Sequence, residues 1–483
     1  MGKASRIVLI NPPVNLEKSY GRLKHFYAPI PPIGVAYLAA ALRRAGHQVF
    51  AIDAYLTQLS VAEVVDAALA FEPDLVGLSV LTPAEPPSRA ISQAIKRLRP
   101  ECWVVWGNVH ATCFYEEAIA QGYADVVNFG EGEERLVQIA AAYPDKEALA
   151  AIKSIAYGSQ GQVVVTAKGE TIDNLDDLPY PAWDLFPVEK FMPDARLTRK
   201  AKIGHGEVQA LPILASRGCP NRCTFCCMST DKALGRKYRM RDPIKVVDEI
   251  QHWVETYDCR TFFLMDLCFP LNKKHALTIC QEIIDRRLDI SWMAETRVDY
   301  ADPEVFQALK KAGCSRLNFG LESGVQRLLD RLKKGFTLEQ ARRAVVLAHE
   351  AGLEAEGLFI IGLPGETVED TWETVRFAKE LKLNLAKFNL LVPYPGTALY
   401  EEFEASGQIR HHDWEAYSPT PGYGGAEPAY VPEGREAEEL HRLQCRAFRS
   451  FFFSPRVIWS NLKEFRPRML KDYWEAFKAI VIP

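Results

Sequence analysis

The sequence predicts an α/β protein with two successive sheets of parallel strands and a small, mainly helical carboxyl-terminal region. From Arg6 to about Tyr143, short β-branched runs alternate with helical stretches, the pattern of a doubly wound parallel sheet. The alternation resumes from Leu211 to about Leu399. A chain of 483 residues is long enough for two or three domains, each with a core of its own.

The composition excludes several classes of protein. Hydrophobic residues make up 48% of the chain, charged residues 25%, and the net charge is -4, so no overall positive field favours nucleic acid. No apolar run reaches the roughly 18 to 20 residues of a membrane span, and the first residues lack signal-peptide anatomy. With 11 cysteines and no secretory signal, a disulfide framework is not expected. We therefore expect a cytoplasmic protein with reduced thiols.

The predicted strands of the first sheet are short and apolar, and cover residues 7–10, 48–52, 75–79, 103–106 and 125–128. The first helix runs from about Pro32 to Ala45 and stops at Gly46. Such sheets bind ligands outside the carboxyl ends of their strands. The candidate binding residues lie there: Pro12, Pro13, Ser79, Thr82, Gly107, Asn108, Val109, His110, Ala111, Thr112, Gly130, Glu131 and Gly132. Taken singly these are ordinary turn residues, and Glu131 and Glu133 could merely complement a helix dipole.

A hairpin and a linker follow the first sheet. Residues 152–165 are predicted to form the hairpin, and prolines interrupt regular structure in residues 174–187. The charged stretch 196–205 is assigned no chemistry. We expect domains over residues 1–150, 205–405 and 406–483, with the hairpin and linker in residues 151–204.

Three cysteines stand on one short loop directly after the first strand of the second sheet. Cys219, Cys223 and Cys226 are separated by three and two residues. Cysteine thiolates hold iron–sulfur clusters, and a cubane with three protein ligands leaves one iron free for a substrate or cofactor. A structural zinc site would need four ligands in paired spacings, a pattern that Cys227 and His205 do not complete. The spacing therefore favours a cluster.

With the aromatic Phe225 before its last cysteine, this Cys-x3-Cys-x2-Cys loop resembles the signature of the radical S-adenosylmethionine (SAM) superfamily. The resemblance implies a 4Fe-4S cluster whose open iron binds SAM, and a reductive cleavage that gives a 5′-deoxyadenosyl radical. It also implies that the second sheet is a partial (β/α)6 barrel of the TIM type, active at the carboxyl ends of its strands. A low-potential electron donor such as flavodoxin or ferredoxin is the implied partner.

Six predicted strands fit this barrel: residues 211–216, 260–265, 290–295, 316–321, 354–361 and 386–392. SAM carries an ammonium, a carboxylate, a ribose and an adenine that must all be held, and polar residues follow these strands. Asp266 can accept from the ammonium and Arg297 can pair with the carboxylate. Alternatively, Asp266 caps a helix and Arg297 makes a surface ion pair. The predicted SAM contacts are Phe225, Asp266, Arg297, Glu322, Ser323, Val392 and Tyr394. No catalytic acid or base is assigned.

A second resemblance lies in the first sheet. Its Asn11-Pro12-Pro13 opening and the stretches 107–112 and 128–134 resemble the Rossmann-like cobalamin-binding domain that precedes many radical SAM enzymes. The family more often has a second glycine where Asn108 stands, and the Asp-x-His-x-x-Gly ligand motif is absent around His25. Cobalt is therefore expected to lack a protein histidine, and His110 is interpreted as a packing or hydrogen-bonding group.

The carboxyl-terminal region is irregular over residues 411–434, a long loop that is a candidate substrate lid, and helical from about Glu436 to Phe453. Its aromatic residues at helical spacing are expected to pack against a domain.

Together the resemblances predict a cobalamin-dependent radical SAM enzyme. Its most common activity is methyl transfer to an unactivated carbon, or less often phosphorus, of a small molecule such as a natural product, lipid or tetrapyrrole. One alternative is cyclisation or rearrangement without methyl transfer, and another is a non-catalytic cobalamin or iron–sulfur carrier. A carrier needs no SAM site, which argues against it. Nothing in the sequence separates a methylase from a cyclase.

Overall fold

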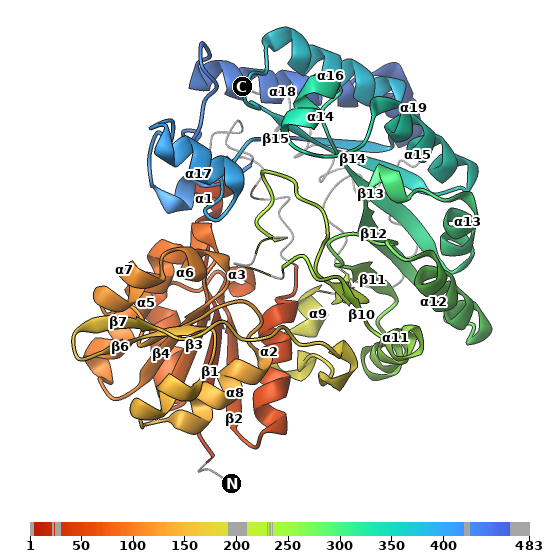
Figure 1. Ribbon diagram of the computed structural model, residues 1–483. Helices are drawn as coiled ribbons and strands as arrows, with labels where there is room; N and C mark the ends of the chain where they lie inside the picture. Colours follow the sequence, from red (N-terminus) through yellow and green to blue (C-terminus); the bar gives the residue numbers. More distant parts are fainter. Residues whose placement is uncertain are drawn as a thin grey trace.

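The computed structural model describes residues 4–21, 24, 30–191, 210–228, 230, 233, 235–419 and 426–463. Two parallel sheets lie in separate halves of the molecule, and the yellow-green segment that carries the three cysteines lies between them (Figure 1). This arrangement confirms the predicted fold class. The interpretations of His25 and of residues 196–205 fall outside the described residues, as do residues 420–425 of the candidate lid.

The first sheet has the order β2-β1-β3-β4-β5-β6-β7. Its parallel strands are β1 (Arg6–Asn11), β2 (Gln48–Asp53), β3 (Leu75–Ser79), β4 (Trp103–Gly107) and β5 (Val126–Asn128). All five lie within one residue of their predicted bounds. The predicted hairpin forms β6 (Ile155–Ser159) and β7 (Gln162–Val165), which extend the same sheet: β6 pairs antiparallel with β5, and β7 pairs antiparallel with β6.

Helices cover both faces of this sheet because successive strand residues point to opposite faces. Ile7 and Leu9 pack with α2 (Ile33–Arg44) and α8 (Glu133–Ala142), whereas Val8 and Ile10 pack with α4 (Val61–Ala70) and α5 (Glu85–Leu98). The linker lies on α2, where the backbone N–H of Ala182 donates to the carbonyl of Ala36 over 3.0 Å. Trp183 is fully buried there, as expected for a linker pinned to a neighbouring surface.

The second sheet has six parallel strands in the order β15-β14-β13-β12-β11-β8. They are β8 (Leu211–Ile213), β11 (Thr261–Leu264), β12 (Ser291–Thr296), β13 (Cys314–Glu322), β14 (Glu354–Ile361) and β15 (Leu385–Leu390). Because β8 and β15 do not pair with each other, the sheet is open, which makes it a partial barrel. The connecting helices include α11 (Pro243–Tyr257), α12 (Lys273–Asp285), α13 (Pro303–Lys311), α15 (Leu338–Glu350) and α16 (Val368–Glu380).

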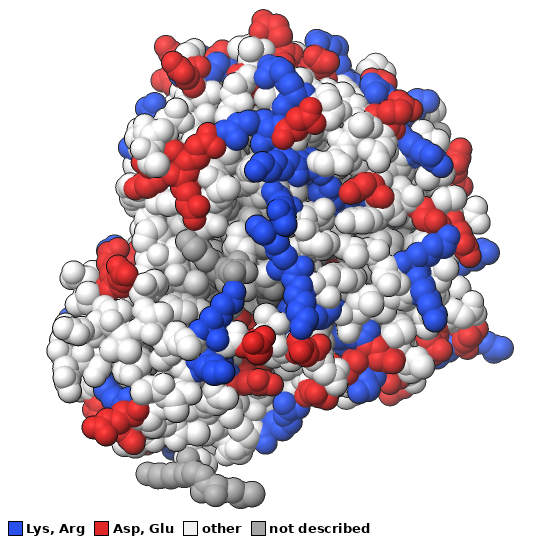
Figure 2. All heavy atoms as spheres, viewed as in Figure 1, with Lys and Arg blue, Asp and Glu red and all other residues white. Residues whose placement is uncertain are grey.

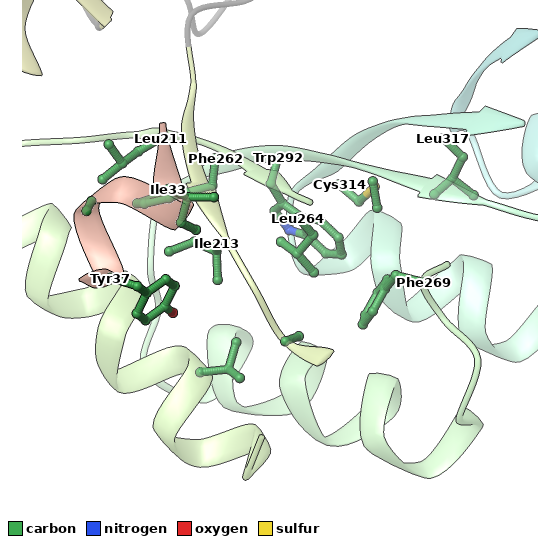
Figure 3. Close-up of a cluster of buried hydrophobic side chains, with 14 of the residues drawn as sticks. Ile33, Tyr37, Leu211, Ile213, Phe262, Leu264, Phe269, Trp292, Cys314 and Leu317 are labelled. Atoms are coloured by element: carbon green, nitrogen blue, oxygen red, sulfur yellow. The ribbon is translucent and has the colours of Figure 1, made fainter. Parts of the chain in front are cut away.

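One hydrophobic core crosses the boundary between the two halves. Ile33 and Tyr37 of α2 lie beside Leu211 and Ile213 of β8 and Phe262 of β11 (Figure 3). All five side chains are buried. The first half of the chain therefore packs directly on the edge strand that leads to the cysteine loop.

The predicted strand 211–216 is shorter in the structure. It ends at Ile213, and the chain then forms a separate two-residue strand, β9 (Ser216–Arg217), antiparallel to β10 (Arg239–Met240). This break turns the chain out of the barrel wall immediately before Cys219. The cysteine loop thus lies outside the ladder of the main sheet.

The carboxyl-terminal region spans the two halves. After α17 (Ala398–Ala405), a short helix η7 (Trp414–Ala416) contacts the first half, where Lys18 pairs with Asp413 and Glu415. Helix α18 (Ala437–Phe452), close to its predicted bounds, packs on β15, and α19 (Pro455–Lys463) follows it. No helix in the described part of the chain is long and apolar enough to cross a membrane.

Candidate active site

The cysteine loop is fixed by backbone hydrogen bonds on both of its sides. The N–H of Cys219 donates to the carbonyl of Gly235 over 3.2 Å, and the N–H of Thr224 donates to the carbonyl of Leu332 over 3.1 Å. Gly218 has φ +85°, and a Cβ there would lie 2.2 Å from the carbonyl oxygen of Lys237. Only glycine permits this close approach.

Nitrogen donors reach two of the three cysteine sulfurs. Asn221 Nδ2 lies 3.3 Å from Cys219 Sγ, and Arg297 Nη1 lies 3.5 Å from Cys223 Sγ. Hydrogen bonds to the sulfur ligands are a common feature of iron–sulfur sites. Among the described residues no three metal-ligating side chains surround a single ion, but a cubane takes each thiolate on a different iron. The assignment of Cys219, Cys223 and Cys226 as ligands of a 4Fe-4S cluster stays a prediction.

Arg297, at the carboxyl end of β12, is held against this loop. Its Nε and Nη2 donate to the two carboxylate oxygens of Asp299 over 3.0 and 3.1 Å, and Nη2 also donates to the carbonyl of Lys334. The side chain is buried. The guanidinium is thus fixed beside Cys223 and already paired with the Asp299 carboxylate. Its contact with SAM stays a prediction.

Glu322 lies at an irregular strand end. Its φ is +61°, uncommon for a residue other than glycine, and the pairing of β13 with β14 shifts register between Gly320 and Glu322. The carboxylate is buried and pairs with Lys334 Nζ over 2.9 Å. That ammonium also lies 5.6 Å from the ring centroids of Phe225 and Phe336. Lys334, which sequence reasoning missed, thus joins the cysteine loop to Glu322.

Two other predicted SAM contacts are engaged in holding the protein together. Asp266 is buried, and its carboxylate accepts from the backbone N–H of Ala215 over 2.8 Å and from the hydroxyl of Ser216. Ser323 Oγ accepts from the N–H of Val325 over 3.1 Å. These contacts fix the ends of β8 and β13, and direct contact of either residue with SAM stays a prediction.

Val392 and Tyr394 form the turn after β15, where the N–H of Tyr394 donates to the carbonyl of Val392 over 2.9 Å. The hydroxyl of Tyr394 donates to the carbonyl of Tyr417 over 3.3 Å. These two predicted SAM contacts therefore adjoin the carboxyl-terminal loop that reaches the first sheet, and their contact with SAM stays a prediction.

At the carboxyl edge of the first sheet, Asn108 makes a left-handed turn with φ +79°. Its Nδ2 donates to Ser79 Oγ over 3.1 Å, and its Oδ1 accepts from the N–H of Val109 over 2.8 Å. Beside it, a Cβ on Gly107 would meet no atom within 4 Å. The positive φ explains why glycine suits position 108, and the open space at Gly107 leaves the backbone accessible.

This edge carries buried acceptors without a hydrogen-bond partner among the described residues. They are Asp53 Oδ2 at the end of β2, Glu85 Oε2 at the start of α5 and Asn128 Oδ1 at the end of β5. A buried acceptor left unpaired is costly. Cobalamin offers amide N–H donors around its corrin ring, so the edge fits that cofactor. Pro12 and Pro13 follow β1 at the same edge.

His110 is buried beneath an aromatic cover. Its ring centroid lies 4.7 Å from that of Phe114 and 5.1 Å from that of Trp414, and Nδ1 lies 3.4 Å from Thr82 Oγ1. Burial lowers the pKa of His110 to about 3, so the ring is neutral. The adjacent Ala111 is buried too, and Thr112 Oγ1 bonds back to the carbonyl of Asn108. These surroundings agree with the interpretation of His110 as a packing group.

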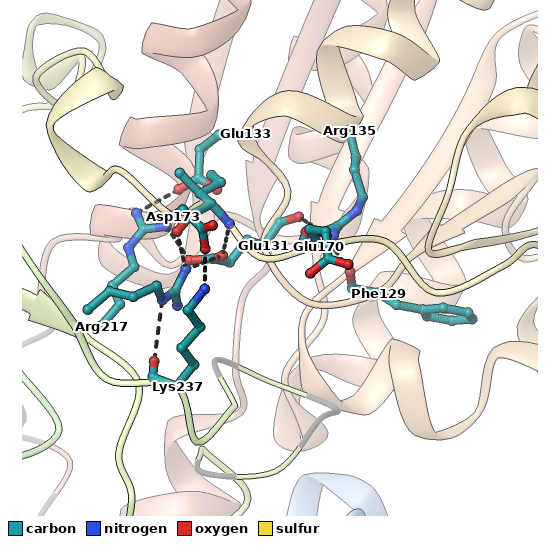
Figure 4. Close-up of polar contacts among 10 residues, drawn as sticks. Phe129, Glu131, Glu133, Arg135, Glu170, Asp173, Arg217 and Lys237 are labelled. Carbon is teal, nitrogen blue, oxygen red and sulfur yellow. Dashed lines mark hydrogen bonds and ion pairs between the residues drawn. The ribbon is translucent and has the colours of Figure 1, made fainter.

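A buried ion-pair network joins the first sheet to the cysteine segment, the stretch from β9 to β10 (residues 216–240) that contains the three cysteines (Figure 4). Glu131 pairs with Arg217 over 3.1 Å and with Arg239 over 2.8 Å, and Glu133 pairs with Arg217 over 2.6 Å. All four side chains are at most 6% exposed. Burial alone would raise the pKa of Glu131, but Arg239 and Arg217 outweigh it and lower that pKa. The Glu131 carboxylate thus contacts Arg217 and Arg239, and it also accepts from the backbone N–H of Ile172 over 2.9 Å. Its predicted contact with cobalamin stays a prediction.

Gly130 and Gly132 flank Glu131 in the loop after β5, and both lie close to neighbouring parts of the chain. A Cβ on Gly130 would lie 3.6 Å from the carbonyl oxygen of Ala233, in the cysteine segment. A Cβ on Gly132 would lie 2.9 Å from Leu38 Cδ2, so a larger residue there would require that side chain to shift. The loop after β5 therefore touches the segment that follows the cysteines.

The fold and the site define a radical SAM enzyme that carries a second cofactor domain: a cysteine loop at the mouth of a partial barrel, pressed against the binding edge of a Rossmann-like sheet. The chain matches the radical SAM superfamily over residues 213–378 and the B12 binding domain over residues 22–140. It belongs to the radical SAM enzymes with an amino-terminal B12 binding domain. These families use a 4Fe-4S cluster, SAM and cobalamin, as predicted.

Full-length relatives support this membership. An uncharacterized methyltransferase of Pyrococcus horikoshii is 31% identical over 470 residues, 97% of both chains. An anaerobic magnesium-protoporphyrin IX monomethyl ester cyclase of Rubrivivax gelatinosus is 31% identical over 436 residues, 89% of this chain and 75% of that protein. The radical SAM methyltransferase TsrM from Kitasatospora setae, solved with cobalamin and a 4Fe-4S cluster, shares the fold with a TM-score of 0.69 at 19% identity, over 97% of this chain and 90% of that one.

Proposed function

We propose that the protein is a cobalamin-dependent radical SAM methyltransferase that acts on an unactivated carbon, or a phosphorus, of a small molecule. In this proposal residues 1–150 bind cobalamin, and residues 205–405 bind the cluster and SAM. The described part of residues 406–483 contacts both halves of the molecule, and this supports a role of the region as a substrate lid. A low-potential protein such as flavodoxin supplies the electron, and a reducing compartment suits the thiols.

The observation that most supports the proposal is the buried ion-pair network of Glu131, Glu133, Arg217 and Arg239. It fixes the loop after β5 to the strand that ends two residues before Cys219. A non-catalytic carrier of cobalamin or of an iron–sulfur cluster would not need to hold the cobalamin-binding edge of the first sheet against the cysteine loop. A reaction that uses both cofactors on one substrate requires that arrangement, because reacting groups must be held a few ångströms apart.

An unactivated carbon is no nucleophile, so it cannot take a methyl group from SAM directly. When bound, the cluster with SAM supplies a hydrogen-abstracting radical, and cobalamin supplies a metal that can carry a methyl group. The residues of this chain position these groups. Arg297, locked by Asp299, faces the cluster loop, and Glu322 is oriented by Lys334. Cys219, Cys223 and Cys226 are the cluster ligands in this proposal.

The relatives include both a methyltransferase and a cyclase at 31% identity, so the overall likeness does not decide between the reactions. The length of the match favours methyl transfer. The chain aligns with 97% of the methyltransferase but with 75% of the cyclase. We therefore take the cyclase reaction as the second candidate.

The test is mass spectrometry of small molecules after anaerobic incubation of the reconstituted enzyme with cobalamin, labelled SAM and a cell extract. We expect products that are heavier by one methyl group and that carry the label from SAM. Products without added methyl mass, formed together with 5′-deoxyadenosine, would favour the cyclase.

A further inference from the structure

Three exposed cationic side chains flank the cysteine loop. Arg222 stands inside the loop, between Cys219 and Cys223. Arg236 and Lys333 come from different parts of the chain, and both are exposed. Figure 2 shows Lys and Arg side chains gathered in a band down the middle of one face, over the region where Figure 1 draws the segment between the two sheets.

Backbone hydrogen bonds fix the positions of these cations relative to the loop. The bond from Cys219 to the carbonyl of Gly235 places Arg236 next to the first cysteine. The bond from Thr224 to the carbonyl of Leu332 places Lys333 next to the residue that follows the second cysteine. The backbones at Arg236 and Lys333 therefore adjoin the loop that contains Arg222, although residues 222 and 333 lie 111 positions apart in sequence.

Within the described part of the chain, these cations differ from the neighbouring ones in having no anionic partner. Among the described residues, none pairs with Arg222, Arg236 or Lys333, whereas Lys237 pairs with Asp173 and Arg331 pairs with Glu402. The whole chain has a net charge of -4. The three cations, which have no anionic partner among the described residues, thus give the region beside the cysteine loop a sign of charge opposite to that of the whole protein.

We propose that Arg222, Arg236 and Lys333 form the docking surface for an acidic one-electron donor protein of the flavodoxin type. The inference rests on the proposed function, since reductive cleavage consumes one electron per SAM and leaves the donor oxidised by one electron. Complementary charge steers such encounters and fixes their orientation. A donor held here lies against the loop that binds the cluster, which shortens the path of the electron.

The test compares the holoenzyme with the double variant Arg236→Glu/Lys333→Glu. The probe is a purified acidic flavodoxin, and its binding is measured by isothermal titration calorimetry at about 50 mM salt. Reversal of two charges should raise Kd at least tenfold. The matched control Lys274→Glu/Arg287→Glu changes the net charge equally at exposed positions on and after α12, and it should bind as the wild type does.

A second arm measures SAM cleavage with a chemical reductant, dithionite with methyl viologen, in place of flavodoxin. This reductant delivers electrons without a docked protein. The double variant should keep this rate within twofold while its flavodoxin-driven rate falls. Wild-type binding should also weaken between 50 and 300 mM salt, because the exposed charges are screened. Unchanged flavodoxin binding in the double variant, or salt-independent binding in the wild type, would overturn the docking surface. Absence of dithionite-driven cleavage in the wild type would instead refute the proposed function, and the binding arm would still report on docking.

Discussion

Arg217 Nη1 lies 3.1 Å from Glu131 Oε1, although 86 residues separate the two in sequence and both side chains are buried. Glu131 follows the last parallel strand of the cobalamin sheet, and Arg217 ends the strand before the cluster cysteines. One ion pair therefore links the loop after β5 to the strand before the three cysteines, the two segments proposed to adjoin the cofactors. Any shift of one loop must displace the other or break a buried pair.

Replacement of Glu131 by Gln should destabilise the protein by about 3–5 kcal/mol, because it leaves Arg217 and Arg239 buried without full compensation of charge. The free energy of unfolding from denaturant titration measures this loss. The control is Glu380→Gln, which breaks an exposed pair with Arg342 and should cost about 1 kcal/mol or less. Equal losses of unfolding free energy in the two variants would show that the buried network stabilises the protein no more than an exposed ion pair does.

Cys223→Ala should remove the cluster, whereas Cys227→Ala should retain it. Burial raises the pKa of Cys227 to about 11, which keeps that thiol protonated and a poor ligand for iron. Iron content, the paramagnetic resonance of the reduced cluster and the yield of 5′-deoxyadenosine are the readouts. A Cys227→Ala protein that binds no cluster while Cys223→Ala does would reverse the ligand assignment.

The strands were predictable from sequence because their apolar runs are short, β-branched and bounded by turn residues. The three candidate cluster ligands could be singled out because they stand on one loop with a distinctive spacing, and their role as ligands stays a prediction. The end of the strand at Ile213 could not be predicted from the sequence, because Leu214 and Ala215 continue the apolar run.

The contacts that organise the site were beyond sequence reasoning because they join distant segments. Glu131 resembled a residue of the cobalamin edge, and only the fold shows its pairing with Arg217 and Arg239. Lys334 follows another lysine and precedes a glycine, a pattern without a chemical signal. Its contact with Glu322 depends on the register shift in β13.

Cobalt should carry no nitrogen ligand from His110. The ring is neutral, but it is packed between Phe114 and Trp414, and moving it to cobalt would open that cluster. Paramagnetic resonance of the Co(II) protein should show no nitrogen superhyperfine splitting in the wild type or in His110→Ala. A splitting in the wild type that His110→Ala abolishes would contradict this prediction.

Stability should fall as the pH rises from about 5 to 8, in part through Glu366. Burial raises the pKa of this carboxyl to about 7 from 4.5. The folded state therefore holds a proton that the unfolded state has lost, and this stabilisation, about 3 kcal/mol at most, disappears as pH passes 7. Glu366→Gln mimics the protonated form, so its unfolding free energy should depend less on pH over this range. Identical pH profiles for the two proteins would exclude a role for Glu366.

The most direct test of the central claim is the ratio of products from SAM during turnover of the true substrate. Methyl transfer with radical activation consumes two molecules of SAM, one as methyl donor and one as radical source. Quantitative mass spectrometry should find S-adenosylhomocysteine and 5′-deoxyadenosine in nearly equal amounts, with the methyl group of the product derived from SAM. Formation of 5′-deoxyadenosine with product but without S-adenosylhomocysteine would contradict methyl transfer.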